Sequence, residues 1–329
     1  MIDYIKISDY ENNLEYKLNL EGRITIITGD SATGKSTLIR YIENYNKDSY
    51  NSIKIESEKK LIHLTPVMVR NKFELDEDTI YFMDEGDNVK SKEYFTLVND
   101  TRYKFVIITR DVSYPSISYD IEDIYEIKYN NGVNKLVKRY KNNYRTDKLD
   151  ASINKIFTED EKSGYEFYKK LGNYSVLSTK GSSRVPYKIK KSNNSIFIVD
   201  SLGFGPYINR TLLNLENNNN IFIAPRSFEH LILMSLFIYS EEELKHKLES
   251  YRESYHLINK FNVNDENIYY QMLIDECFGL GIDYSKSNLP DYFTEEKNFN
   301  KVMRTVERLY KLPLNSIDNN SNNDIFSWE

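Results

Sequence analysis

Apolar runs of strand length alternate with amphipathic, helix-length segments along most of this chain, and the pattern predicts an α/β fold. The apolar run at 24–28 predicts a buried strand that leads through a glycine-containing loop into a helix at about 37–44. Before it, residues 3–20 alternate apolar and polar side chains, which predicts antiparallel strands. Later apolar runs at 79–83 and 103–108 predict further buried strands.

The second half of the chain repeats this alternation after a break. A hairpin at 123–140 is expected to close the first sheet, and the polar stretch at 141–150 has no period, which predicts a linker. Strands and helices then alternate again, which predicts a second parallel α/β sheet. The predicted parts are a first α/β domain at 1–145, a second at 151–235, a helical region at 236–315 and a disordered tail at 316–329.

Composition narrows the class of protein. The 329 residues carry a formal net charge of −6, which argues against a general nucleic-acid-coating protein and leaves room for a local basic groove. The single cysteine, Cys277, excludes an intrachain disulfide and is expected to be a small buried residue. The sequence contains no apolar run of the roughly 18 to 20 residues that a membrane span needs, and its first residues lack the pattern of a signal peptide. A cytoplasmic protein without a membrane partner is therefore expected.

The loop after the first buried strand has the spacing Gly-x-x-x-x-Gly-Lys-Ser. Gly29 and Gly34 let successive backbone N–H groups point into one concave space, which suits an anion. Lys35 adds a positive charge within reach of β- and γ-phosphates, and the Ser36 hydroxyl is a ligand for Mg²⁺. The next helix points its positive end at the same place. The sequence predicts a site for ATP and Mg²⁺, with binding residues Gly29, Asp30, Ser31, Ala32, Thr33, Gly34, Lys35, Ser36 and Thr37.

Two later strands end in polar residues that suit the same chemistry. Asp84 follows the strand at 79–83 and is predicted to hold Mg²⁺ through its water shell, and Glu85 is predicted to polarise the attacking water. The strand at 103–108 leads into Thr109 and Arg110. This pair fits a sensor of the γ-phosphate, with Arg110 as a nucleotide-binding residue, and it equally fits the ordinary polar exit of a strand.

The order of these motifs resembles that of P-loop ATPases with an additional catalytic glutamate, and among them the ABC-type ATPase heads. The resemblance covers about residues 1–145 and rests on the phosphate loop, the acidic strand end and the run Val106–Arg110. Arg110 stands where such heads carry a switch histidine. The stretch between Lys35 and Asp84 is short and lacks a Ser-Gly-Gly signature. The resemblance implies a compact P-loop head that binds and hydrolyses ATP.

Carboxylates also mark strand ends in the second half. Glu159 follows the strand predicted at 153–158, and Asp200 ends a later one. These strands resemble the Toprim fold of topoisomerases, primases and OLD-family nucleases, in which a Glu and a later Asp-x-Asp hold Mg²⁺ for phosphodiester chemistry. Leu202 stands at the second aspartate, and Glu229 is predicted to replace it. The resemblance implies Glu159 and Asp200 as catalytic residues and, with Glu229, as metal ligands. The alternative is a non-catalytic α/β domain with acidic loop starts.

Together the two resemblances imply an ATPase whose nucleotide state gates a Toprim-like module, with Glu85 as its catalytic residue. The expected partners are ATP, nucleic acid, a protein effector and further copies of the chain, in nucleic-acid processing or antiviral defence. A small-molecule kinase is a second interpretation, because the phosphate loop also suits phosphotransferases. A third is a non-catalytic, ATP-dependent switch that holds a partner, because Leu202 removes one carboxylate.

Two further patterns concern the last third of the chain. His230, beside Glu229, is expected to be a packed or capping residue. Four basic residues recur at helical spacing, which is typical of a solvated helix face and also fits a phosphate-binding stripe; they are Lys301, Arg304, Arg308 and Lys311.

Overall fold

The computed structural model describes residues 3–45, 52–87, 91–100, 102–114, 117–144, 153–216, 218–238, 240–258, 265–312 and 314. The chain divides into two compact units, residues 1–141, 201–210 and 248–268 in the first and residues 142–200, 211–247 and 269–329 in the second. The predicted linker lies partly outside the described residues, and the predicted tail lies wholly outside them. The predicted helical region does not form a unit of its own, because its residues are shared between the two.

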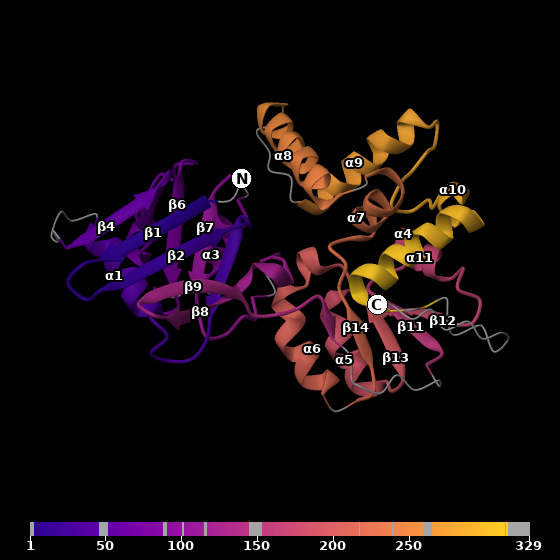
Figure 1. Ribbon diagram of the computed structural model, residues 1–329, viewed down its shortest axis with the longest axis horizontal. Coiled ribbons are helices and arrows are strands. Elements are labelled where there is room, and N and C mark those ends of the chain that lie inside the picture. The colour runs from indigo at the N-terminus through magenta and orange to yellow at the C-terminus, as the bar shows by residue number, and fades with distance from the viewer. Residues whose placement is uncertain are drawn as a thin grey trace. The chain divides into compact units, whose positions relative to one another are not determined.

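The first unit is built on a nine-stranded mixed sheet (Figure 1). Its strands in chain order are β1 (Asp3–Asp9), β2 (Leu14–Leu20), β3 (Ile24–Thr28), β4 (Ile53–Ser57), β5 (Lys60–His63), β6 (Thr79–Asp84), β7 (Lys104–Ile108), β8 (Ile124–Asn130) and β9 (Val133–Lys138). Across the sheet they lie in the order β4-β1-β2-β9-β8-β3-β7-β6-β5. Three helices accompany these strands in the described sequence up to residue 100, namely α1 (Lys35–Tyr45), α2 (Pro66–Arg70) and α3 (Lys92–Val98).

One side of this sheet is parallel. Its five strands run in the same direction and pair with one another in the order β8-β3-β7-β6-β5. Every residue of β3 and β7 is buried, as expected for parallel strands that are covered on both faces. Ile27 of β3 and Asp84 of β6 both pair with Ile108 of β7. The ends of these three strands therefore lie at one level of one sheet edge.

The other side of the sheet is largely antiparallel. β1 pairs antiparallel with both β2 and β4, and β8 and β9 form an antiparallel hairpin. Asn131 and Gly132 at the tip of the hairpin both have positive φ, 48° and 83°, as a two-residue turn of type I′ requires. The antiparallel strands predicted at 3–20 and the hairpin predicted at 123–140 are confirmed.

Tyr41 anchors helix α1 to the first turn of the sheet. Its hydroxyl donates to Asp9 Oδ2 at 2.6 Å, and both side chains are buried. Burial by itself would raise the pKa of Asp9, but hydrogen bonds from Tyr41 and Asn12 and from the backbone N–H groups of Asn12 and Glu11 outweigh it and lower that pKa. One ionised carboxylate thus joins the turn after β1 to the helix that follows the phosphate loop.

Replacing Tyr41 by phenylalanine keeps the ring and removes the donor. A hydrogen bond to a charged group contributes about 1.5 to 3 kcal/mol, so we expect the free energy of unfolding to fall by about 2 kcal/mol, measured by urea denaturation. Tyr45→Phe is the matched control, because Tyr45 lies in the same helix and is 48% exposed. Equal midpoints for Tyr41→Phe and the wild-type chain would show that Asp9 does not need this donor.

The second unit contains a five-stranded sheet in the order β10-β14-β13-β11-β12. Its strands are β10 (Asn143–Tyr144), β11 (Lys155–Thr158), β12 (Ser175–Ser178), β13 (Ser195–Ile198) and β14 (Ile221–Ile223). Four of them are parallel and β10 is antiparallel at the edge, so the predicted second parallel α/β sheet is confirmed. The strand order reverses between β11 and β13, and at such a point the carboxyl ends of the strands open a crevice.

Helices alternate with the strands after β10, and further helices follow β14. They are α4 (Ser163–Tyr168), α5 (Val185–Lys191), α6 (Ile208–Leu215), α7 (Phe228–Ile232), α8 (Glu241–Ile258), α9 (Asp265–Gly279), α10 (Asp291–Thr294) and α11 (Glu296–Tyr310). α11 buries Val302 and Val306 and exposes Lys301, Arg304 and Arg308, so the predicted basic face is exposed.

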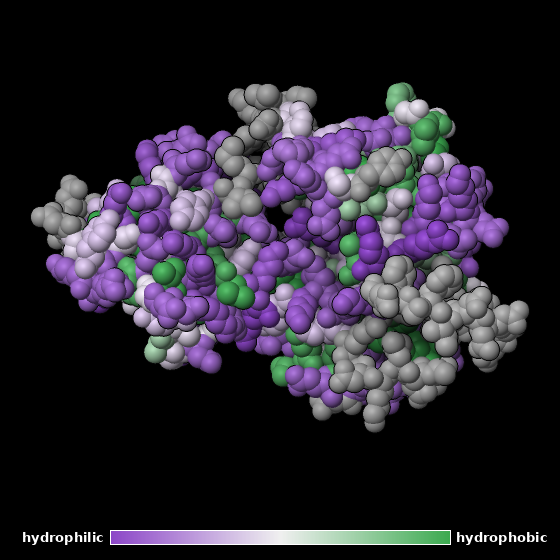
Figure 2. All heavy atoms as spheres, viewed as in Figure 1, coloured by the Kyte–Doolittle hydropathy of each residue, from purple (hydrophilic) through white to green (hydrophobic). Residues whose placement is uncertain are grey.

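Helix α9 ends in a buried cysteine followed by exposed apolar side chains. Cys277 is buried, as predicted. Phe278 is 84% exposed and Leu280 is 56% exposed, and Figure 2 shows hydrophobic surface at this end of α9. No helix within the described ranges is long and apolar enough to cross a membrane.

Candidate functional site

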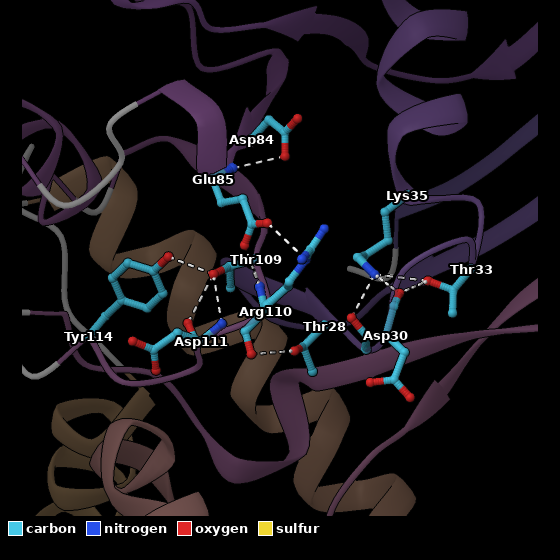
Figure 3. Close-up of polar contacts among 11 residues, drawn as sticks. Thr28, Asp30, Thr33, Lys35, Asp84, Glu85, Thr109, Arg110, Asp111 and Tyr114 are labelled. Carbon is cyan, nitrogen blue, oxygen red and sulfur yellow. Dashed lines mark hydrogen bonds and ion pairs between the residues drawn. The ribbon is translucent and has the colours of Figure 1, made fainter.

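The loop between β3 and α1 folds around the ammonium group of Lys35 (Figure 3). Lys35 Nζ donates to Gly29 O at 2.7 Å, to Asp30 O at 2.6 Å and to Thr33 Oγ1 at 2.9 Å. The Lys35 side chain lies almost wholly inside the loop, since the residue is only 9% exposed. The predicted phosphate cradle is therefore a ring of oxygen acceptors closed around one cation.

The backbone of the loop needs its two glycines. Gly29 and Gly34 have φ angles of 127° and 89°, which side chains rarely tolerate. A Cβ at Gly34 would come within 2.6 Å of the Tyr16 hydroxyl, which donates to Gly34 O at 2.8 Å. Burial raises the pKa of Tyr16 to about 12, so its hydroxyl stays protonated. Ala32 also has positive φ, 64°, without the freedom of a glycine.

Tyr16 is a site residue that the sequence analysis missed. It lies on β2, far upstream of the loop, and only the folding of the sheet brings its hydroxyl to Gly34. Thr37, predicted as a binding residue, lies near the same hydroxyl and opposes the rise of the Tyr16 pKa. The sequence around Tyr16 alternates apolar and polar residues, and no local signal connects this tyrosine with the loop.

The acidic end of β6 is tied to the end of β7. Asp84 Oδ1 accepts the N–H of Glu85 at 2.8 Å. Glu85 Oε2 accepts the N–H of Arg110 at 2.7 Å, and Glu85 Oε1 lies 3.2 Å from Arg110 Nε. The Arg110 side chain is 65% exposed, so solvent screens this ion pair. The bonds hold the Glu85 carboxylate in one position at the sheet edge.

Thr109 and Arg110 have different surroundings at the end of β7. The Thr109 hydroxyl accepts from Tyr114 OH at 2.9 Å and from the N–H of Asp111 at 3.1 Å, and it donates to Asp111 O at 3.0 Å. Thr109 is thus part of an ordinary strand exit. The Arg110 side chain instead extends toward Glu85 and the phosphate loop (Figure 3).

Charges from three segments of the chain act on Lys35. Burial lowers its pKa, and the positive charge of Arg110 lowers it further, whereas Glu85, Asp30 and Asp84 oppose this effect. These groups come from the phosphate loop, the end of β6 and the end of β7, whose strands are neighbours in the sheet. The structure therefore brings Lys35, Asp84, Glu85 and Arg110 together at one edge.

The structure places both predicted Mg²⁺ ligands, Ser36 and Asp84, at the ends of their elements. Ser36 is exposed at the start of α1, and Asp84 is partly buried at the end of β6. Hydroxyl and carboxylate oxygens are the ligands that this hard cation prefers, and it retains several waters when proteins bind it. Ser31 and Ala32 are exposed at the tip of the loop.

In the second unit, Glu159 and Asp200 lie at adjacent strand ends. Thr158 of β11 pairs with Ile198 of β13, and Glu159 and Asp200 follow these strands at the point where the strand order reverses. Glu159 Oε2 accepts the N–H of Asp200 at 3.3 Å, and Glu159 Oε1 accepts the hydroxyl of Ser182. The structure brings these two predicted residues together.

The prediction of Glu229 as a third ligand beside them is wrong. Glu229 opens α7 as predicted, but it is only 4% exposed and Oε1 accepts the Tyr284 hydroxyl at 3.0 Å. Burial and the charge of Glu229 raise the pKa of Tyr284, so Tyr284 stays a donor. No three His, Cys, Asp or Glu side chains of the described part of the chain form a group that could hold a metal ion. The residues of the second unit therefore do not fit the three-carboxylate Mg²⁺ site.

His230 has the packed role expected from the sequence. Its ring lies edge-on to the ring of Tyr269, with 5.1 Å between the centroids. Its backbone N–H donates to Ser227 Oγ at the start of α7.

No protein-family model matches this chain, and no curated protein matches it. Support for a function therefore comes from the residues themselves.

Proposed function

We propose that this chain is an ATPase that binds MgATP at the loop between β3 and α1. The observation that carries the proposal is the convergence of Lys35, Glu85 and Arg110 at the carboxyl edge of neighbouring parallel strands. The three strands that lead into these residues are neighbours, because β7 lies between β3 and β6.

Binding of ATP would exchange the partners of Lys35. Its ammonium now donates to three oxygens of its own loop. The β- and γ-phosphate oxygens carry full negative charge and would take the place of these neutral acceptors, because charge-assisted hydrogen bonds are about twice as strong as neutral ones. The backbone N–H groups at the start of α1 then face the phosphates.

Ser36 and Asp84 are the residues that would hold Mg²⁺ in this site. When bound, the ion neutralises charge on the phosphate oxygens.

Glu85 would accept the proton of the attacking water. Its carboxylate is fixed by the backbone N–H of Arg110, and this bond does not require the Arg110 side chain. The guanidinium group is free to leave Glu85 for the more negative γ-phosphate, since its ion pair is exposed and weak. Glu85 would then keep its position while losing the cation that neutralises it.

We further propose that the nucleotide state of the first unit gates the second, and that the second unit binds nucleic acid. The support is a parallel sheet with Glu159 and Asp200 at the point where its strand order reverses. The biological setting that we infer, by resemblance to proteins that pair an ATPase with a Toprim module, is nucleic-acid processing or defence against phage and plasmids.

Product analysis of the purified chain tests the ATPase proposal. The chain is incubated with γ-labelled ATP and Mg²⁺, with and without a cell extract of small metabolites. Release of inorganic phosphate as the only labelled product is the expected result. Absence of ATP binding would overturn the proposal, and transfer of label to a metabolite would assign a kinase instead.

Arg110 should distinguish ATP from ADP. Arg110→Ala removes the guanidinium and keeps the backbone N–H that holds Glu85, so we expect the ratio of ATP to ADP affinity to fall about tenfold, as the loss of one charge-assisted contact predicts. Isothermal titration with each nucleotide measures this ratio. Arg102→Ala is the control. It removes an arginine that pairs with Asp100 just before β7, at the end of the strand away from Arg110. An unchanged ratio would exclude Arg110 as a γ-phosphate contact.

A further inference from the structure

A pocket of about 470 Å³ opens beside the loop that follows β12 in the second unit. Its lining consists of hydroxyl, aromatic and basic side chains, and it includes no carboxylate: Ser178, Thr179, Lys180, Ser183, Arg184, Tyr187 and Lys188. Three cations line this pocket, although the chain as a whole carries a formal net charge of −6. The lining therefore has the chemistry of an anion site.

The cations continue along one face of α5 beyond the pocket. Arg184, Lys188 and Lys191 are spaced by four and then three residues, so they share a side of the helix. Another side of the helix buries Val185, Pro186 and Ile189, so the basic side faces outward. At 1.5 Å per residue the three cations span about 10 Å, which is longer than a single phosphate group.

These cations have few acidic partners. Lys180 Nζ lies 3.8 Å from Glu161 Oε1, and both side chains are more than half exposed, so this pair is weak. Within the described ranges, Arg184, Lys188 and Lys191 form no ion pair with a carboxylate. Their charge is available to a ligand.

The loop that carries Lys180 is held against the strand end of Glu159. Thr179 Oγ1 donates to Glu159 O at 3.0 Å, Gly181 N donates to the same oxygen at 2.7 Å, and the Ser182 hydroxyl donates to the Glu159 carboxylate. The basic pocket and the acidic strand end therefore share one loop. A ligand in the pocket lies next to the crevice of this sheet.

Tyr187 adds an aromatic surface to the pocket. Its side chain is 52% exposed, although the ring is large and apolar. The ammonium of Lys191 lies 4.3 Å from the centre of the ring, and the interaction with Lys191 lowers the pKa of Tyr187. An exposed ring beside cations is the arrangement on which bases of single-stranded nucleic acids stack.

We propose that this pocket binds the phosphate backbone of a single-stranded nucleic acid, with Tyr187 as the stacking surface for a base. The proposal rests on the nucleic-acid role inferred for the second unit. The length of the cation row favours a strand with several phosphates over a free nucleotide. The exposed ring favours unpaired bases, because the bases of a duplex stack on each other and have no free face.

Fluorescence anisotropy with the full chain and an end-labelled oligothymidylate of about 16 nucleotides tests the proposal. The pocket variant combines Arg184→Ala with Lys188→Ala. The matched control combines Lys170→Ala with Lys190→Ala, which removes the same charge from two exposed positions of the second unit outside the pocket. Circular dichroism confirms that both variants are folded.

We expect the wild-type chain and the control to bind the strand, and the pocket variant to bind it at least about tenfold more weakly at low salt. Each neutralised phosphate of a single strand contributes about 0.7 to the slope of log K against log salt, so the slope should become about 1.4 less steep. Equal weakening in both variants, absence of binding by the wild-type chain, or stronger binding to a duplex of equal length would overturn the proposal. Displacement of the strand by an equal concentration of thymidine monophosphate would overturn it as well.

The role of the ring has its own test. Tyr187→Ala should weaken binding of oligothymidylate about tenfold, whereas Tyr187→Phe should bind like the wild-type chain, because both rings stack. An abasic strand should not distinguish the two variants. Equal affinities of Tyr187→Ala and the wild-type chain for oligothymidylate would exclude stacking.

Failure of this inference can be told apart from failure of the ATPase proposal. A fluorescent ATP analogue reports on the first unit in the same preparations. The pocket variant should bind the analogue normally. Lys35→Met should fail to bind the analogue, and in a separate measurement without nucleotide it should bind the strand like the wild-type chain.

Discussion

Replacing Lys35 by methionine is expected to lower the affinity of the chain for ATP at least about 100-fold. Methionine keeps the length and the apolar stem of the side chain, so the burial of the helix start is preserved, but it cannot donate. A 100-fold loss corresponds to about 2.7 kcal/mol, which is within the range of hydrogen bonds to a charged group. The effect is large because the Lys35 ammonium lies inside the loop, where solvent does not replace it.

Isothermal titration with MgATP measures this loss. Lys17→Met is the control, because Lys17 is a partly exposed lysine of β2 that pairs with Glu15. Thr33→Ala separates charge from loop structure, since it removes one hydrogen bond of Lys35 and leaves the ammonium in place. We expect only a few-fold loss for Thr33→Ala. An affinity of Lys35→Met within threefold of the wild-type value would remove Lys35 from the nucleotide site.

The arrangement of strand, loop and helix around Lys35 was predictable because its residues are contiguous in sequence. The two glycines, Lys35 and Ser36 fall at fixed spacing, and a buried strand and a helix flank them. The same holds for Asp84 and Glu85, which directly follow an apolar run. Parallel strands place their carboxyl ends on one edge of a sheet, so two strand ends found separately in the sequence come together.

Contacts between distant segments were not predictable. The Tyr16 hydroxyl reaches Gly34 only because β2 folds beside the loop. The sequence left two roles open for the pair Thr109 and Arg110, and it did not indicate that Tyr114 would hydrogen-bond to the Thr109 hydroxyl. Residue types at a strand end indicate the available chemistry, while the packing of later residues determines which side chain faces the site.

Glu229 illustrates the same limit in the second unit. The sequence placed it correctly at the start of a helix after a strand of the sheet. It did not indicate that Tyr284, more than fifty residues later, would bury the carboxylate and bond to it. The hydrogen bond from Tyr284 satisfies the buried Glu229 carboxylate in its present position. Turning toward Glu159 would break this hydrogen bond.

The basic pocket was missed for a different reason. Lys188, Lys190 and Lys191 form a short basic run, which is usually a solvated face. The run became informative only when the fold placed Lys180 and Arg184 beside it around one cavity. A helical projection of residues 184–191 would have shown the shared side of Arg184 and Lys188, but not the loop that completes the pocket.

Glu85→Gln is expected to separate ATP binding from hydrolysis. Glutamine has the shape of glutamate and still accepts the backbone N–H of Arg110, so the side chain keeps its place. It cannot take a proton from water, and loss of a general base lowers rates by about 10² to 10⁴. We expect phosphate release to fall by about 10³, while the affinity for MgATP changes less than threefold because Glu85 is not a phosphate ligand.

A coupled phosphate assay and titration with MgATP measure the two quantities on the same protein. Glu93→Gln, an exposed position of α3, is the control for the change of charge and should leave both unchanged. The Arg110 side chain provides a further comparison. Arg110→Ala in the Glu85→Gln background should weaken ATP binding as it does in the wild-type chain, because the two side chains are given separate roles. Phosphate release by Glu85→Gln at the wild-type rate would mean that another group activates the water, and the acidic end of β6 would then serve binding alone.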